Sequence, residues 1–398
     1  MKTTSASSAL RTAFAAAALL PALHAGFSLA GTPVDAAKAV QPAAATEESE
    51  FDKIWSLATL YKNPSNPWIE EVRLFGRFHE NWADEQTNRG DWEGFEARRV
   101  RAGIDIKFLD GFELRGEYRF IPSQYPIKAT QGLTDANLSW SIDPAFKITV
   151  GKQLPPFTDE GIITSNELLT VERSNVANTF WTGEDNYSTG VSISGTKNAW
   201  QYYAGVFSGE LDPYFSKFDA GYYYVGGLGY DFARQLKVDH ALLRVDYVYN
   251  DGNPLNLAPK PFSNTVDLDF ELKQGRYGLN GTVIRGSGIG KQPDVWGLEI
   301  MPTFSITKKL EFVTRYTFLD SDGAGGIKPE RRYENEVPDI NGTRGDRYQA
   351  VYAGLNYYIY GHKLKLQTGI EYSTMHDSSG KGGAFEAWSY QSGFRLSF

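Results

Sequence analysis

The sequence predicts an all-β protein, a transmembrane antiparallel β-barrel of about 16 strands. Three observations lead to this fold class. From residue 70 to the end, apolar and polar residues alternate with a period of two, and charges occupy the polar face in strand after strand. Short and long connections between these runs mostly alternate along the chain. The last run ends on an aromatic residue, Phe398.

The composition excludes several other classes of protein. The chain has 398 residues and no Cys, which excludes a disulfide-stapled fold, a zinc finger and a thiol enzyme. Its formal net charge of -8 argues against a nucleic acid partner, because nothing in the balance neutralises phosphates. Tyr (23), Phe (24) and Gly (40) are frequent and Met (3) is rare, a balance typical of strands and turns. Beyond the N-terminus, no apolar run approaches the roughly 20 residues of a membrane helix.

The N-terminus predicts export from the cytoplasm. Lys2 and Arg11 precede a short apolar run, and small residues follow it, which is the layout of a secretory signal peptide over residues 1–30. We expect cleavage after Ala30, with Ala25 as a second candidate. The run is too short to span a membrane, so an anchoring helix is the weaker interpretation.

Residues 31–69 are predicted to form a periplasmic N-terminal leader before the barrel at 70–398. Apolar residues recur at steps of three and four between 51 and 61, which indicates one short helix. Pro64 and Pro67 follow it and cannot continue a helix. The period then changes to two.

The strands are predicted from that period. In the second strand, apolar residues occupy the even positions from 100 to 108, and most odd positions from 99 to 107 are charged. The same rule predicts strands at 70–82, 95–108, 112–121, 132–141, 146–153, 187–196, 199–208, 219–232, 239–250, 263–273, 276–286, 294–306, 310–320, 347–360, 363–376 and 385–398.

The connections indicate the topology. Links after even-numbered strands are brief, whereas most links after odd-numbered strands are long, as at 83–94, 154–186, 251–262 and 321–346. Outer-membrane barrels have short periplasmic turns and longer external loops, and an even strand count places both chain ends in the periplasm. A sheet in hydrocarbon must also close on itself, so the last strand, ending at Phe398, is expected to pair with the first.

With the barrel predicted, particular residues resemble a known family. The segment from 149 to 181 is similar to the signature of the phosphate-selective porin O and P family, and segments 95–120, 310–322 and 353–372 resemble its other strands. The residues that carry the main resemblance are Val150, Gly151, Pro156, Phe157, Glu160, Ser165, Asn166, Glu172, Arg173 and Ser174. The family has a Lys before the Pro-Phe turn, where this chain has Leu154, and here Lys152 lies two residues earlier.

The resemblance implies a bacterial outer-membrane porin in which loop 154–186 folds inward and narrows the pore. The alternative, an exposed loop, conflicts with the many apolar residues of the segment. Family membership also implies a homotrimer surrounded by outer-membrane lipid and lipopolysaccharide. The candidate residues of the constriction loop and its border are Lys152, Glu160, Asn166, Glu172 and Arg173.

Charged residues of the polar face give a second set of candidates. Six arginines on three consecutive strands are predicted to form a basic wall of the lumen: Arg73, Arg77, Arg99, Arg101, Arg115 and Arg119. Arginine offers fixed hydrogen-bond donors for anions. The alternative is that they pair with acidic residues across strands and only keep the wall polar. Asp267, Asp269 and Glu271 share the polar face of the tenth strand, which indicates an acidic strip opposite the basic one.

We therefore predict a passive diffusion channel for small hydrophilic solutes, preferring anions such as phosphate. A non-selective or cation-preferring porin is the main alternative, and a barrel enzyme or a polysaccharide export channel is less favoured. No cofactor, metal site or catalytic residue is predicted, since His79, His240, His362 and His376 are scattered and no nucleophile with a His and acid partner is recognisable.

Overall fold

The computed structural model describes residues 49–398 except 121–131, 182–186, 257 and 260. The predicted signal peptide and most of the predicted leader lie outside these residues. Within them, one 17-stranded sheet contains all the strands. No helix in this part of the chain has the length and apolarity needed to cross a bilayer.

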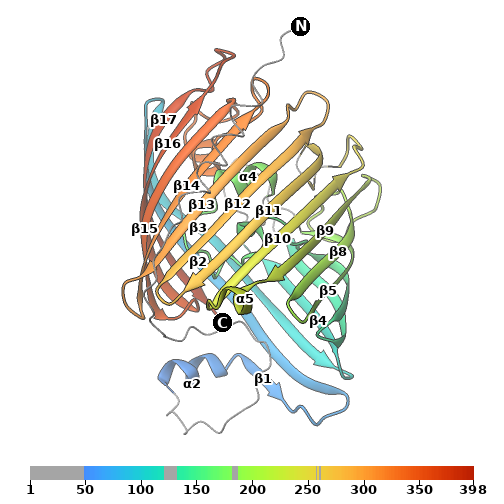
Figure 1. Ribbon diagram of the computed structural model, residues 1–398. Coiled ribbons are helices and arrows are strands. Elements are labelled where there is room, and N and C mark those ends of the chain that lie inside the picture. Colours follow the sequence, from blue (N-terminus) through green and yellow to red (C-terminus); the bar gives the residue numbers. More distant parts are fainter. Residues whose placement is uncertain (1–48, 121–131, 182–186, 257, 260) are drawn as a thin grey trace. The chain divides into compact units, whose positions relative to one another are not determined.

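Sixteen of these strands form a closed antiparallel barrel, which confirms the predicted fold class (Figure 1). Each strand from β2 to β17 pairs with its neighbour in sequence, and β17 pairs with β2 to close the ring. The barrel strands are β2 (Ile69–Thr87), β3 (Gly90–Phe108), β4 (Phe112–Arg119), β5 (Gly132–Asp143), β6 (Phe146–Gln153), β7 (Ser188–Lys197), β8 (Trp200–Ser208), β9 (Tyr222–Asp231), β10 (His240–Asn250), β11 (Phe262–Gln274), β12 (Tyr277–Gly288), β13 (Val295–Ser305), β14 (Leu310–Ser321), β15 (Arg347–Tyr360), β16 (Leu364–His376) and β17 (Phe385–Ser397).

The outer face of the barrel is largely apolar, and many inward-facing side chains are polar or charged. In β11, the exposed side chains of Val266 and Leu268 alternate with the buried carboxylates Asp267 and Asp269. The period of two puts these sets on opposite faces of the sheet. Exposed apolar residues on the outer face suit lipid, and the buried polar residues face the lumen.

The helices are short, and none of them is part of the barrel wall. They are α2 (Glu50–Ser56), α3 (Asp159–Ile162), α4 (Asn175–Phe180), α5 (Ala233–Leu236) and α6 (Arg331–Glu336). Helix α2 begins at a capping box made by Ser49 and Asp52. It ends earlier than the predicted 51–61 helix, because Thr59–Lys62 form strand β1, which pairs with β2.

The predicted long loop at 83–94 is wrong. Strand β2 continues to Thr87 and β3 begins at Gly90, so the connection is a tight turn. The many polar and charged residues of this segment suggested a loop. In the barrel, however, Glu85 is a buried inward-facing residue, and its carboxylate pairs with Arg332 at 3.0 Å.

The C-terminal residue takes part in barrel closure. The backbone N–H groups of Phe398 and Gly76 each donate to the other residue's carbonyl at 3.1 Å. A Cβ on Gly76 would lie 2.8 Å from the Phe398 ring and from the Arg101 carbonyl oxygen. Only glycine fits this close approach without a shift of its neighbours.

Candidate functional site

Segment 154–181 packs inside the barrel and is called the constriction loop below. It carries α3 and α4 and enters the lumen between β6 and β7. Its ends pack on one side of the wall through aromatic rings. Trp181 contacts Phe157 and Tyr223 edge to face, with ring centroids 5.4 and 5.9 Å apart, and Phe180 stacks on Phe262 at 5.1 Å. These rings are buried, so apolar packing fixes the base of the loop.

The middle of the constriction loop is fixed by side chains that point inward from the opposite strands. Lys365 Nζ donates to the Leu168 carbonyl at 2.6 Å, and Arg395 Nη2 donates to the Val171 carbonyl at 2.8 Å. Asn356 Nδ2 likewise donates to the Leu169 carbonyl at 2.9 Å. An irregular segment in a lumen needs such donors, because its carbonyls are not satisfied by a helix or sheet.

Arg315 of β14 joins the loop to the wall through charge. Its Nη1 lies 2.8 Å from Glu160 Oε1 and its Nη2 lies 3.1 Å from Glu371 Oε2. Glu160 also accepts from the backbone N–H of Ser174, while its carbonyl accepts from Arg173 Nε at 2.8 Å. The predicted residues Glu160 and Arg173 therefore hold the loop's two short helices together.

Glu172 forms a second link between the constriction loop and the wall. Its Oε1 lies 2.8 Å from Arg98 Nε and accepts from Asn81 Nδ2 at 2.7 Å, while Oε2 lies 3.8 Å from Arg99 Nη2. The register of β2 and β3 shifts between His79 and Glu80, so that Arg98 is an extra residue in β3. This β-bulge explains why two consecutive arginines are both buried beside one carboxylate.

The arginines of the predicted basic wall lie on β2, β3 and β4, and most share carboxylates. Asp105 lies 2.8 Å from Arg73 and 3.5 Å from Arg115, while Glu117 lies 2.9 Å from Arg77 and 3.3 Å from Arg101. The side chains of Arg73 and Arg115 are 44% and 33% exposed, whereas those of Arg99 and Arg101 are 1% and 2% exposed. Only the first two of these four have substantial contact with solvent. Arg119 lies at the end of β4, opposite Arg101.

The remaining candidates of the loop region contact the protein. Lys152 is buried, and its ammonium group donates to the carbonyls of Asp212 and Tyr214. It therefore ties β6 to the 209–221 connection. The Asn166 side chain lies 3.1 Å from His79 Nε2, and Arg77 Nη1 donates to Ser165 Oγ at 2.9 Å.

A second loop, the connection between β14 and β15, also packs inside the barrel, against β2 and β16. Helix α6, from the connection between β14 and β15, places Arg332 against Glu85 and Glu371, each at 3.0 Å. Burial raises the pKa of Glu330, at the start of this helix, and the nearby Arg332 opposes that rise. The two loops meet where Asn175 Nδ2 donates to the Lys328 carbonyl at 3.0 Å.

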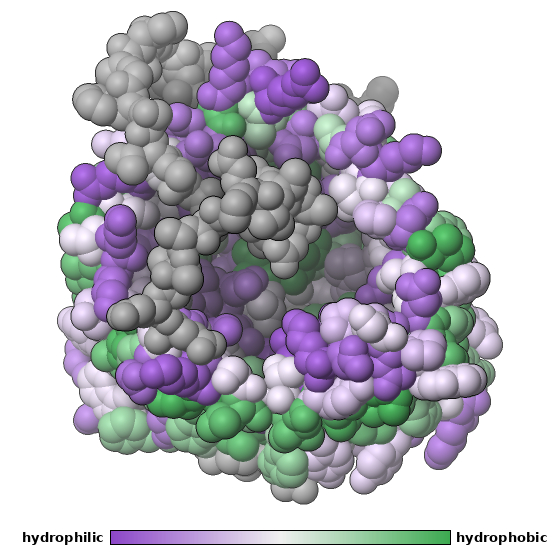
Figure 2. All heavy atoms as spheres, turned by 90° about the horizontal axis from the view of Figure 1, so that it is seen from below, coloured by the Kyte–Doolittle hydropathy of each residue, from purple (hydrophilic) through white to green (hydrophobic). Residues whose placement is uncertain are grey.

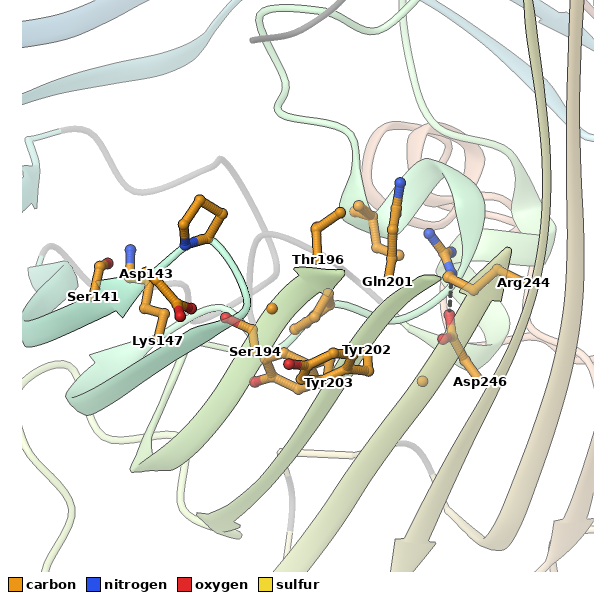
Figure 3. A pocket seen from close by; sticks show the side chains of 15 residues that line it. Ser141, Asp143, Lys147, Ser194, Thr196, Gln201, Tyr202, Tyr203, Arg244 and Asp246 are labelled. Atoms are coloured by element: carbon orange, nitrogen blue, oxygen red, sulfur yellow. Dashed lines mark hydrogen bonds and ion pairs between the residues drawn. The ribbon is translucent and has the colours of Figure 1, made fainter. Parts of the chain in front are cut away.

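An open cavity remains beside the constriction loop. It has a volume of ≈ 660 Å³, and its walls come from β5 to β10 together with Pro156 and Ile162 of the loop. Ser194, Gln201 and Arg244 are among its polar lining residues (Figure 3). Seen from below, the molecule is hollowed at its centre, with hydrophilic residues around much of the opening (Figure 2).

The acidic residues predicted on β11 lie on the strand next to β10, which forms one edge of this cavity. Asp267 and Asp269 are buried, and Asp269 pairs with Arg244 of β10. Glu271 lies near the end of the strand and accepts from His240, 2.9 Å away. Burial, together with the neighbouring Asp269, raises the pKa of Asp159 in α3 well above its ordinary value.

Sequence reasoning missed several residues that hold the loops, namely Arg98, Arg315, Arg332 and Arg395. Arg315 lies on the inward parity of its strand, and that signal could have found it. Arg98 could not be found in this way, because strict alternation places it on the outer face. Its inward position depends on the bulge.

Comparison with known protein families gives one match. The model of the family "phosphate-selective porin O and P" matches residues 72–303, which is more than half of the chain. The chain belongs to this family. It is therefore an outer-membrane porin, a channel protein rather than an enzyme. The porin's match begins in β2 and includes the constriction loop.

Solved structures share the porin's fold at low sequence identity. The outer-membrane channel DcaP of Acinetobacter baumannii is 11% identical with a TM-score of 0.52, over 84% of this chain and 99% of that one. An anion-selective porin from Comamonas acidovorans is 13% identical with a TM-score of 0.53, over 82% and 99%. OmpF of Salmonella typhi is 10% identical with a TM-score of 0.56, over 85% and 100%. No curated protein matches the chain significantly.

Proposed function

We propose that this porin is a passive diffusion channel with a moderate preference for small anions, and that solutes pass through the cavity beside β5 to β10. The observation that carries the proposal is the basic strip, a cluster of arginines on β2 to β4 that outnumber the carboxylates they pair with. On β2 to β5, the four arginines Arg73, Arg77, Arg101 and Arg115 share three carboxylates, Asp105, Glu117 and Asp135. Four guanidinium groups and three carboxylates leave this ion-pair cluster with a formal charge of plus one.

Only the arginines of this strip whose side chains are exposed to water in the lumen can act on passing solutes. Arg73 and Arg115 have 44% and 33% of their side chains exposed, so their charges reach the lumen water. Arg99 and Arg101 are buried in ion pairs and serve as wall residues in this proposal. A charge in a narrow lumen is only partly screened, whereas exposed surface charges are screened beyond about 10 Å at 0.1 M salt. The local charge can therefore outweigh the acidic net charge of the chain.

Close specificity for phosphate is not part of the proposal. The family's lysine before the Pro-Phe turn is replaced by Leu154, and Lys152 directs its ammonium group to two backbone carbonyls. A lysine held in this way has few donors left for a solute. The predicted mechanism is electrostatic enrichment of anions without a dedicated phosphate site.

The reversal potential in a salt gradient across a planar bilayer tests this proposal. We expect the unaltered porin to prefer anions, and we expect Arg73→Gln/Arg115→Gln to shift the reversal potential towards cations. Arg285→Gln is the matched control, because Arg285 is also partly exposed but lies outside the basic strip. The second candidate, a non-selective or cation-preferring porin, is favoured by the ion pairing of the arginines. An unchanged potential in the double variant supports that candidate.

The orientation and assembly of the porin are part of the same proposal. We place the connections 154–187 and 322–346 towards the cell exterior and the turn at 361–363 in the periplasm. Residues 1–30 are removed as a signal peptide, and residues 31–69 remain as a periplasmic leader. A cysteine introduced into the 322–346 connection is expected to be labelled on intact cells, and one introduced at 361–363 is not. We propose a homotrimer in contact with lipid and lipopolysaccharide, which cross-linking of intact membranes tests.

A further inference from the structure

Three carboxylates from two adjacent strands converge at the wall of the lumen. Asp246 of β10 pairs in register with Asp267 of β11, and Asp269 lies two residues further along β11. One oxygen from each of the three lies within 4.8 Å of the others, and all three residues are buried. The strand period of two explains the arrangement, because Asp267 and Asp269 must share a face.

Asp267 is the unusual member of this trio. It is 0% exposed, and neither of its carboxylate oxygens has a hydrogen-bond partner. Its neighbours are better satisfied, since Asp269 accepts from Thr282 Oγ1 at 2.6 Å and Asp246 accepts from Arg244 Nε at 2.8 Å. A buried carboxylate without a partner is costly, so native proteins pair it or use it to coordinate a metal.

The charge of the trio is not balanced by its neighbours. Arg244 forms ion pairs with Asp246 and Asp269 and supplies a single positive charge. Three carboxylates and one guanidinium leave a formal charge of minus two, which one divalent cation would neutralise.

One member of the trio lies at the wall of the open cavity. Asp246 and Arg244 both line the ≈ 660 Å³ cavity and lie side by side in Figure 3, joined by their ion pair. Gly227 of β9 faces Asp246 Oδ1 and has no side chain to cover it. The trio therefore borders the cavity through Asp246, while Asp267 and Asp269 lie buried behind it.

We propose that Asp246, Asp267 and Asp269 bind one hard divalent cation, with Ca²⁺ favoured over Mg²⁺. All the available ligand atoms are carboxylate oxygens, the type that both ions prefer. Ca²⁺ accepts irregular arrangements with two oxygens from one carboxylate, whereas Mg²⁺ requires near-ideal octahedral geometry. Asp267 supplies both oxygens, Asp246 and Asp269 supply the others, and water from the cavity completes the shell. Binding also neutralises an acidic part of the wall, so Ca²⁺ increases the preference of the channel for anions.

Equilibrium dialysis with radioactive Ca²⁺ tests the site on the folded barrel after treatment with a chelator. We expect one Ca²⁺ per chain, and we expect Asp267→Asn to weaken its affinity by more than about tenfold, since even outer-shell changes cost that much. The Asn variant keeps the size of the side chain and breaks no hydrogen bond, so it is expected to fold. Asp322→Asn, at an exposed carboxylate next to β14, is the control and should bind Ca²⁺ as the unaltered protein does.

Thermal unfolding gives a second measurement that does not depend on conductance. Ca²⁺ at millimolar concentration should raise the midpoint of the unaltered barrel and leave that of Asp267→Asn unchanged. Equal binding by both proteins, as ions held by residual lipopolysaccharide would give, overturns the proposal. It is also overturned if the unaltered barrel binds no Ca²⁺ and Asp267→Asn changes only the pH dependence of stability, because the carboxylates then share protons. The binding result stands apart from anion preference, so each proposal can fail without the other.

Discussion

The two halves of the barrel wall use their inward-facing polar residues in different ways. On β14 to β17, β2 and β3, inward-facing residues such as Arg315, Lys365 and Arg395 donate hydrogen bonds to the constriction loop. On β5 to β10, residues such as Ser194 and Gln201 line an open cavity. The comparison teaches that the placement of the loops, held by charged residues of one half of the wall, leaves the open space of the lumen beside the other half.

Replacing Arg315 should have the largest effect on this difference. In Arg315→Ala, the carboxylates of Glu160 and Glu371 lose the cation that lies within 3.1 Å of each. Breaking a buried ion pair on one side costs about 3–5 kcal/mol. We expect lower stability to denaturant and a larger single-channel conductance, because the constriction loop loses its link to β14.

Arg285→Ala serves as the control for this variant. Its ion pairs with Asp294 and Asp322 are exposed, and such pairs contribute about 0–1 kcal/mol. If the two variants were equally stable and conducted equally, Arg315 would not hold the loop.

A smaller effect is expected at Lys365, within the same half of the wall. In Lys365→Met, the Leu168 carbonyl keeps only its bond from Gln367, at 3.0 Å, and loses the one from Lys365. A buried polar group left short of partners costs about 1–3 kcal/mol. Lys363→Met changes an exposed lysine that contacts the Tyr360 ring, and should cost less than about 1 kcal/mol. Equal free energies of unfolding for the two variants would contradict a role of Lys365 in holding the constriction loop.

The smallest expected effect concerns the second loop and depends on pH, because Glu336 is only partly buried and solvent weakens its interactions. Burial, with Glu96 nearby, raises the pKa of Glu336 in α6 from 4.5 to about 7. The folded protein thus favours the neutral form, and it loses stability as the pH rises from 4.5 through about 7. Glu336→Gln removes this loss, so the variant should be more stable than the unaltered protein at pH 8 and equal to it at pH 4. A constant difference across this range would exclude the titration of Glu336 as its cause.

The fold was largely predictable from the sequence, because alternation is enforced along each strand by lipid on one face and the lumen on the other. The segment 83–94 was the exception, since Glu85 within it faces inward to Arg332, which is far away in the sequence. The site was predictable only in part. Glu160 and Glu172 could be singled out by family resemblance, but their partners Arg315 and Arg98 depend on loop placement and on a bulge.

The difference between the two halves of the wall is tested most directly by single cysteines in a chain that has none. Ser194 lines the cavity, whereas Ser389 is fully buried and donates to Glu85 Oε1 at 2.9 Å. A charged, thiol-reactive reagent is added during single-channel recording of Ser194→Cys and Ser389→Cys. We predict that the current through the first is reduced in steps and that the current through the second is unchanged. Block of Ser389→Cys with no effect on Ser194→Cys would place the channel on the other side of the barrel and contradict the account.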